Sequence, residues 1–202
     1  MKSAIKNKII ILSFVFSAMS CKSQTPIYDI SALDGTNEMA GAYYKDTQNR
    51  LNPFEGTYIY NQNGKMFKIV LQKKEMSLRY NYYRDIIIGE YQYIENGIEK
   101  KNTLNQLMIN FSDGIYYSIH GNLIMESDYL CDDCLPGETH LRGGLVETST
   151  SSIAEIDFKL TTVDGQPAMR VWLYWRYKTG KPNSPPNLQP SFPGGEYIMI
   201  KQ

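Results

Sequence analysis

Residues 56–72 read Gly-Thr-Tyr-Ile-Tyr-Asn-Gln-Asn-Gly-Lys-Met-Phe-Lys-Ile-Val-Leu-Gln. Two runs rich in Tyr, Ile and Val, residue types that favour β-strands, flank the pair Asn63-Gly64. Asn-Gly is the preferred pair in a two-residue hairpin turn, because both positions need a positive φ. In the second run Phe67, Ile69 and Leu71 occupy alternate positions. This period of two predicts a strand with one wet face, and the whole stretch predicts an antiparallel hairpin.

The same pattern continues through the chain from Pro53 onward. Asn96-Gly97 separates residues 86–94 from 98–104, and residues 155–160 repeat the alternation with Ile156, Phe158 and Leu160. Three more reversals are predicted at Asp113-Gly114, Gly121-Asn122 and Asp164-Gly165. About nine to ten short strands and no helical periodicity predict an all-β antiparallel meander. Because closure removes exposed edges, we expect a single lipocalin-like barrel over residues 53–202, with a two-sheet β-sandwich as the alternative.

The N-terminus has the pattern of an export signal. Lys2, Lys6 and Lys8 precede a ten-residue apolar run, which is shorter than the roughly 20 residues of a membrane-spanning helix. The run ends in Ala18-Met19-Ser20-Cys21, which resembles the lipobox of bacterial lipoproteins. We therefore expect residues 1–20 to be a signal peptide and Cys21 to carry the lipid. Residues 21–52, which lack apolar periodicity, are expected to hold this cysteine, a tether and an entry loop.

Charge narrows the list of partners. The first 20 residues contain three of the 21 basic residues and no acidic one, so the remaining 182 residues carry a net charge of −3. Without a cluster of Lys and Arg, nucleic acid is not expected as a partner. The membrane is expected to be reached through the lipid alone. Lys22-Ser23-Gln24 lacks the acidic cluster associated with surface display, which favours a periplasm-facing anchor in the cell envelope over display at the surface.

Cys131-Asp132-Asp133-Cys134 is the only compact motif. If Cys21 is lipidated, two thiols remain in an oxidising compartment, which favours a loop-closing disulfide. A zinc site is the alternative, because His120 and His140 flank the pair and two thiolates with two imidazoles suit tetrahedral zinc. A calcium loop would use Asp128, Asp132, Asp133 and Glu138. Redox catalysis is not expected, since neither a helix N-terminus nor a cation is placed to stabilise a thiolate.

Residues 168–177 form the strongest predicted strand. Its core face would hold Met169, Val171, Leu173, Trp175 and Tyr177. Its other face would hold Arg170, Trp172, Tyr174 and Arg176. An aromatic pair between two guanidinium groups suits a planar or anionic ligand or a sugar, and packing between strands is the alternative interpretation. The proline-rich residues 179–195 cannot form a strand and are interpreted as a strap over an open barrel end.

No catalytic signature occurs in the sequence, so an enzyme and a cofactor are not expected. We expect a non-catalytic binding module for a small ligand or peptide, whose barrel mouth is framed by the loop at 131–134 and the proline-rich loop. The alternative is a protein-interaction or inhibitor lipoprotein that contacts another envelope protein.

One stretch resembles a known family. Residues 42–58 read Ala-Tyr-Tyr-Lys-Asp-Thr-Gln-Asn-Arg-Leu-Asn-Pro-Phe-Glu-Gly-Thr-Tyr. They resemble a flavobacterial lipoprotein family, domain of unknown function 6705, which shows Tyr-x-Lys-Asp, Asn-x-Leu-x-Pro, an aromatic residue and Gly-Thr-Trp. Residues 82–91 resemble a second block of that family, and the likeness covers mainly residues 42–110, with Tyr58 in place of the usual Trp. The family has no known activity, and its Gly-x-aromatic opening is similar to that of lipocalin barrels, so the resemblance implies only a fold.

Overall fold

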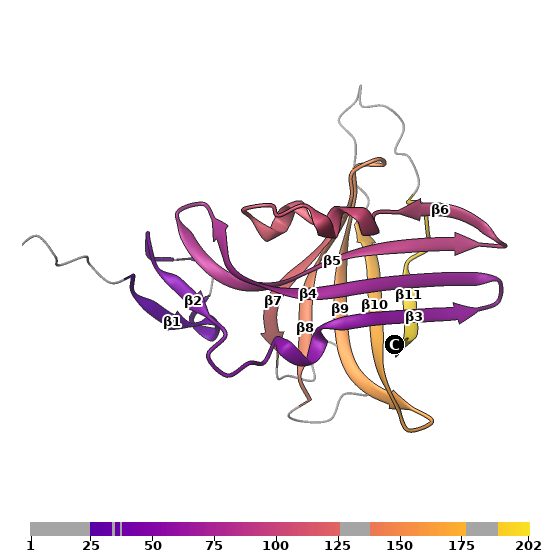
Figure 1. The fold of residues 1–202 in the computed structure, drawn as a ribbon, viewed down its shortest axis with the longest axis horizontal. Coiled ribbons are helices and arrows are strands. Elements are labelled where there is room, and N and C mark those ends of the chain that lie inside the picture. Colours follow the sequence, from indigo (N-terminus) through magenta and orange to yellow (C-terminus); the bar gives the residue numbers. More distant parts are fainter. Residues whose placement is uncertain (1–24, 34, 37, 126–137, 177–189) are drawn as a thin grey trace, which may run out of the picture.

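The computed structural model describes residues 25–33, 35–36, 38–125, 138–176 and 190–202, and this part of the chain is all-β (Figure 1). The strands are β1 (Ile27–Asp29), β2 (Tyr43–Lys45), β3 (Gly56–Gln62), β4 (Lys65–Arg79), β5 (Tyr82–Glu95), β6 (Ile98–Asn102), β7 (Ile119–Met125), β8 (His140–Glu147), β9 (Ser152–Val163), β10 (Gln166–Arg176) and β11 (Gly195–Lys201). Short 3-10 helices are η1 (Ile30–Ala32), η2 (Asn52–Phe54), η3 (Leu104–Met108) and η4 (Gly114–Tyr116). None of these helices is long and apolar enough to cross a membrane.

Eight strands close into an up-and-down barrel. From β3 to β11, leaving out β6, each strand pairs antiparallel with the next barrel strand along the chain. The ring closes where β11 returns to β3, with Ile200 opposite Ile59. The predicted antiparallel barrel is confirmed, and the sandwich alternative is wrong, because β5 pairs with β7 and β11 with β3 so that no barrel edge stays open.

Strand β5 joins the barrel to an N-terminal extension. One edge of β5 pairs with β4, while its other edge pairs in turn with β2, β7 and β6. Strands β1 and β2 are parallel to their neighbours and extend the sheet on the left of Figure 1. Within the range 21–52, expected to be a tether and an entry loop, the chain from Ile27 onward forms two short strands and packs on the sheet. The physical reason is burial: Tyr43 and Tyr44 of β2 are covered, so this segment packs on the barrel.

Three of the predicted turns are confirmed by the structure and two are wrong. Asn63-Gly64, Asn96-Gly97 and Asp164-Gly165 all have positive φ at both positions and connect hairpins, as predicted. The reversal predicted at Asp113-Gly114 is instead the start of η4, because the Asp113 carboxylate caps it by accepting from Ile115 N. Gly121-Asn122 lies inside β7, where a Cβ at Gly121 would come within 2.8 Å of the Gly143 Cα. That glycine permits two strands to approach closely and makes no turn.

Side chains fill the barrel interior. The core faces predicted for β4 and for Met169 to Trp175 of β10 are confirmed, since all of these residues are buried. On β9 the predicted face is buried at Ile156 and Phe158, whereas Leu160, near the end of the strand, is 37% exposed. The packed interior is a single cluster to which every barrel strand contributes. In the described residues, side chains from the barrel strands therefore pack against one another inside the barrel.

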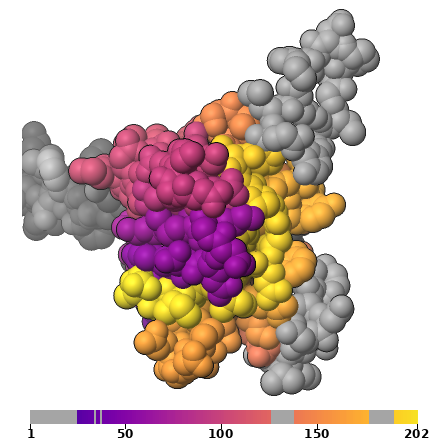
Figure 2. Space-filling view, turned by 90° about the vertical axis from the view of Figure 1, so that its right-hand side faces the viewer, coloured from indigo at the N-terminus to yellow at the C-terminus, as the bar shows by residue number. Residues whose placement is uncertain are grey.

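Phe192 closes one end of the barrel. Its ring lies 4.8 Å from that of Phe67, 5.1 Å from Tyr91 and 5.3 Å from Trp175. The Trp175 indole Nε1 donates to the Phe192 carbonyl oxygen at 3.1 Å. The coloured atoms on the side of the molecule that carries the β3–β4 and β5–β6 turns form a continuous surface (Figure 2). The described end of the proline-rich segment therefore packs into the barrel core, whereas residues 179–189 lie outside the described residues and the strap stays a prediction.

Glu90 is a buried carboxyl on the outer wall of β5. Its Oε1 accepts from Ser118 N at 3.0 Å, and its Oε2 has no hydrogen-bond partner among the described residues. Burial raises the pKa of Glu90, although hydrogen bonds from Ser118 and Thr103 oppose this shift. The folded protein therefore holds this proton to a higher pH than the unfolded chain does. Any stability associated with the protonated carboxyl is complete below the ordinary pKa and is lost as pH rises through the folded one.

Glu90→Gln, which imitates the protonated carboxyl, is expected to unfold at a higher urea concentration than the wild type at pH 8. The difference is expected to vanish near pH 4, where both states of the wild type are protonated. Urea titrations from pH 4 to pH 8 measure it, with Glu99→Gln on the exposed strand β6 as the matched control. A gain that stays constant over this range would contradict the assigned cause.

Candidate functional site

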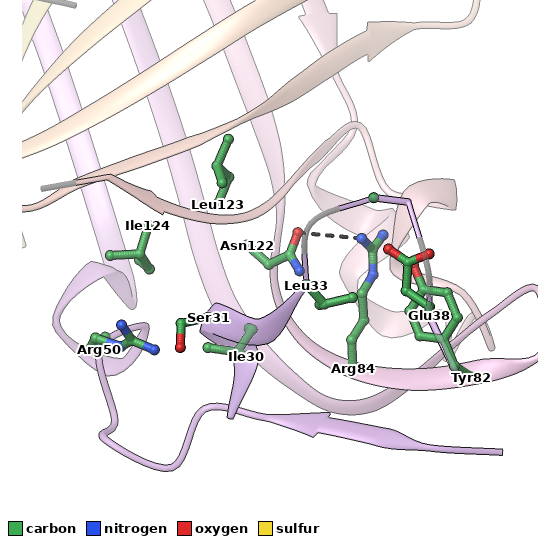
Figure 3. Close-up of a pocket in the computed structure, with 11 residues that line it drawn as sticks. Ile30, Ser31, Leu33, Glu38, Arg50, Tyr82, Arg84, Asn122, Leu123 and Ile124 are labelled. Carbon is green, nitrogen blue, oxygen red and sulfur yellow. Dashed lines mark hydrogen bonds between the residues drawn. The ribbon is translucent and has the colours of Figure 1, made fainter. Parts of the chain in front are cut away.

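A cleft of about 310 Å³ lies outside the packed barrel, between the N-terminal extension and β7 (Figure 3). Residues in and after η1 form one wall, and Asn122 to Ile124 of β7 form the other. Arg50 lies at one end of the cleft, and Arg84 lies at the other with Glu38 and Tyr82. The lining residues are Ile30, Ser31, Leu33, Gly35, Glu38, Arg50, Tyr82, Arg84, Asn122, Leu123 and Ile124.

Two buried carboxylates hold the N-terminal wall in place. Asp85 of β5 accepts from the Tyr43 hydroxyl at 2.5 Å and from Asp46 N at 2.9 Å. Asp46 in turn accepts from Leu51 N and from Lys73 Nζ, at 2.9 and 3.0 Å. Burial opposes the ionisation of Asp46, but the bonds from Leu51 and Lys73 outweigh it and lower the pKa of this carboxyl. The two sequence blocks that carry the family resemblance, 42–58 and 82–91, therefore meet beside the cleft.

The Arg50 end is electrically balanced. Arg50 Nη2 lies 2.6 Å from Asp29 Oδ1, which makes an ion pair across the loop. Asp29 is itself oriented by Ser31 N at 2.9 Å and by the Thr47 hydroxyl. Arg50 thus shapes this end of the cleft without adding net charge.

The Arg84 end holds a cation without an ion-pair partner in the described residues. Its Nη1 donates to Asn122 Oδ1 at 3.3 Å, the dashed line in Figure 3, and its Nε is buried with no hydrogen-bond partner there. Two acids act on Arg84 through space. Glu38 makes no ion pair with it, and Asp113 is already paired with Arg79 at 3.3 Å. Burial lowers the pKa of Arg84, but a guanidinium stays charged in proteins. Most of its donors are therefore available to an anion.

Aliphatic side chains line the middle of the cleft. Ile30 and Leu33 lie on the side of η1, and Ile124 faces them from β7, whereas the Leu123 side chain points to the other side of that strand (Figure 3). Such walls with a few polar groups at the ends are typical of sites for small organic molecules. The arrangement suits binding of a molecule with an apolar body and a charged head.

The predicted ligand-binding face on β10 lies elsewhere, on the outer wall of the barrel. Trp172 and Tyr174 are 50% and 61% exposed, so this face points outward as predicted. Arg170 pairs with Glu196 on β11 at 2.5 Å, and Arg176 pairs with Glu155 on β9. None of these four residues lines the cleft. Ligand binding by this face stays a prediction, and its guanidinium charges are balanced by neighbouring strands.

Cys21, Cys131 and Cys134 lie outside the described residues, so lipidation and the disulfide stay predictions. The two histidines of the alternative metal site are separated. His120 lies opposite Gly144, four positions from His140 along β8, which is roughly 14 Å at the rise of a strand. His140 Nδ1 is 3.0 Å from Asp157 Oδ1. Within the described ranges no three His, Cys, Asp or Glu side chains gather to hold a metal ion.

Sequence reasoning missed the cleft. The one local signal was Arg84, a charged residue between Tyr82 and Ile86 on the outer face of β5. Arg50 and Glu38 lie in segments without periodicity, so nothing in the local pattern placed them beside Arg84.

Comparison with known proteins gave one match. The profile of the Family of unknown function (DUF6705) matches residues 5–202. No curated protein and no solved structure matches the chain. The geometry of the cleft is therefore the guide to function.

Proposed function

Since the chain belongs to the Family of unknown function (DUF6705), which brings no activity with it, we propose from its geometry that it is a non-catalytic binding module. The ligand is a small molecule that carries a carboxylate and an aliphatic body, and it occupies the cleft beside Arg84.

The observation that carries this proposal is the state of Arg84. Burying part of a guanidinium without a direct ion pair costs free energy, because the group loses hydration that no carboxylate contact replaces. Nevertheless, the only hydrogen bond of this guanidinium in the described residues goes to the neutral Asn122 amide. A ligand carboxylate would accept two parallel hydrogen bonds from the guanidinium fork and remove this cost. The aliphatic walls would cover the rest of the ligand.

Arg84→Gln tests the proposal. Calorimetric titration with 4-methylpentanoate and with leucine is expected to show binding to the wild type and a Kd about 10- to 100-fold higher for the variant, because charge-assisted bonds are lost. The ligand-free variant is expected to be at least as stable as the wild type, since a partly buried charge without a direct ion pair in the described residues is removed. Arg176→Gln, which removes an exposed guanidinium on β10, is the control. Equal affinities in the wild type and Arg84→Gln, or no binding to the wild type, would refute the proposal.

We also propose that Cys21 is lipidated and anchors the module in the cell envelope, facing the periplasm. The signal-like residues 1–20 and the lipobox-like ending support this placement. Ile27 of β1 comes six residues after Cys21, a span of roughly 20 Å at most for an extended chain, so the anchor would hold the cleft near the membrane surface. Mass spectrometry of the membrane-extracted chain tests the anchor. An unmodified Cys21 would refute it.

A further inference from the structure

Two opposite charges line the same end of the cleft without touching each other. Glu38 and Arg84 both lie there with Tyr82 (Figure 3). No ion pair joins the Glu38 carboxylate to the guanidinium, and no hydrogen bond to Glu38 is found within the described residues. Glu38 lies close enough to Arg84 to favour the charged form of the guanidinium. This end of the cleft therefore presents a negative charge on Glu38 and a positive charge on Arg84 that are not in direct contact.

From this geometry we infer that the ligand is a free aliphatic α-amino acid, bound as a zwitterion; the inference rests on the proposed function. The α-carboxylate accepts from Arg84, with the Asn122 amide beside it. The α-ammonium, one carbon away, donates to Glu38. Such a ligand satisfies both protein charges at once and adds no net charge to a site that is already balanced.

Other head groups satisfy only half of this arrangement. A plain carboxylate or inorganic phosphate would pair with Arg84 but would lie close to the Glu38 carboxylate, and like charges repel at such a distance. A plain amine would pair with Glu38 and leave Arg84 unmatched. Only a head group with both charges removes both costs.

Tyr82 supports the placement of the ammonium. Its side chain is buried, lines the cleft at the Glu38 end and lies close enough to feel the Glu38 charge. The face of an aromatic ring attracts a cation, and a carboxylate next to a ring is a favourable site for an ammonium group. Tyr82 and Glu38 together therefore form the ammonium side of the head-group site.

The remaining wall defines the side chain of the amino acid. The side chains of Ile30, Leu33 and Ile124 offer no hydrogen-bonding group. The charge at the far end, Arg50, is already neutralised by Asp29 at 2.6 Å. A branched aliphatic side chain of the size of leucine or isoleucine matches this surface, whereas a charged side chain would be desolvated without a partner.

The test compares leucine with its two halves by calorimetric titration of the wild type. One is 4-methylpentanoate, which lacks the amine, and the other is 3-methylbutylamine, which lacks the carboxylate. Leucine is expected to bind at least ~10-fold more tightly than either, because each loses a charge-assisted contact. Glu38→Gln is expected to abolish the preference for leucine over 4-methylpentanoate while keeping binding of the latter. Glu99→Gln, an exposed carboxylate on β6, is expected to keep the full preference.

The outcomes separate the two proposals. If 4-methylpentanoate binds as tightly as leucine, and Arg84→Gln weakens both, the zwitterion inference is overturned while the carboxylate site stands. If Glu38→Gln leaves the preference intact, the inference is overturned as well. If neither compound binds the wild type, the proposed function itself fails.

Discussion

Asp85→Ala is expected to lower the free energy of unfolding by about 3–5 kcal/mol, the largest effect of any single polar substitution in the network that holds the N-terminal extension on β5. The carboxylate is fully buried and accepts from the Tyr43 hydroxyl, Asp46 N and Met76 N at 2.5, 2.9 and 3.2 Å. Alanine would remove the acceptor from all three donors and would leave the buried Tyr43 hydroxyl and Asp46 N unsatisfied away from water. Urea denaturation followed by circular dichroism measures the loss.

Two further variants define the cause of that loss. Asp85→Asn keeps one acceptor oxygen and the side-chain volume, so it is expected to recover part of the stability. Glu155→Ala removes an exposed carboxylate that pairs with Arg176 on the outer wall and is expected to cost less than about 1 kcal/mol. Because Asp85 holds β2 on β5, the folded fraction of Asp85→Ala is also expected to bind leucine more weakly. A loss of stability no larger than that of Glu155→Ala would show that the network does not hold the extension.

Phe192→Ala is expected to destabilise the protein by about 3–5 kcal/mol through the void that it leaves at the barrel end. The ring packs against Phe67, Tyr91, Tyr93 and Trp175. The Tyr91 and Tyr93 hydroxyls are buried there without hydrogen-bond partners among the described residues, so the surrounding wall gains little by collapsing. Thermal and urea unfolding measure the effect.

Two control variants separate the contribution of Phe192 to packing from any contribution to ligand binding. Phe192→Leu fills most of the void and is expected to lose less than half as much stability as the alanine variant. Tyr174→Ala, on the exposed face of β10, is expected to stay within about 0.5 kcal/mol of the wild type. Since Phe192 does not line the cleft, leucine affinity is expected to be unchanged in the folded Phe192 variants. Equal stability of Phe192→Ala and Tyr174→Ala would mean that the ring does not support the barrel.

The local patterns predicted the hairpins correctly where a turn chemistry is specific. Asn-Gly and Asp-Gly pairs at 63–64, 96–97 and 164–165 have the positive φ angles that these residues tolerate. The same reasoning failed at Gly121, because a glycine needed for close strand approach has the same sequence signature as a glycine needed for a turn. Composition alone does not separate these two uses.

The candidate site was beyond local patterns because it depends on contacts between distant segments. The parallel pairing of Tyr43 with Tyr83 brings together residues forty positions apart, and no period within either segment encodes it. The opposite error occurred on β10, where the guanidinium groups of Arg170 and Arg176 suggested a ligand site. Their counterions, Glu196 and Glu155, lie on the adjacent strands and became evident only in the sheet.

The sequence by itself determined the barrel, because neighbouring strands in a meander pair through turns and alternation that are local properties of the chain. It also determined which faces of β4 and β10 are buried. Only the tertiary structure decided where a ligand would bind. In the described residues, side chains from every barrel strand and Phe192 form one buried core. The cleft lies outside this core, between the N-terminal extension and β7, and Arg84 and Glu38 line it without an ion pair within the described residues. Which charges are neutralised is a property of contacts across the fold, and that is the physical reason why the site required the structure.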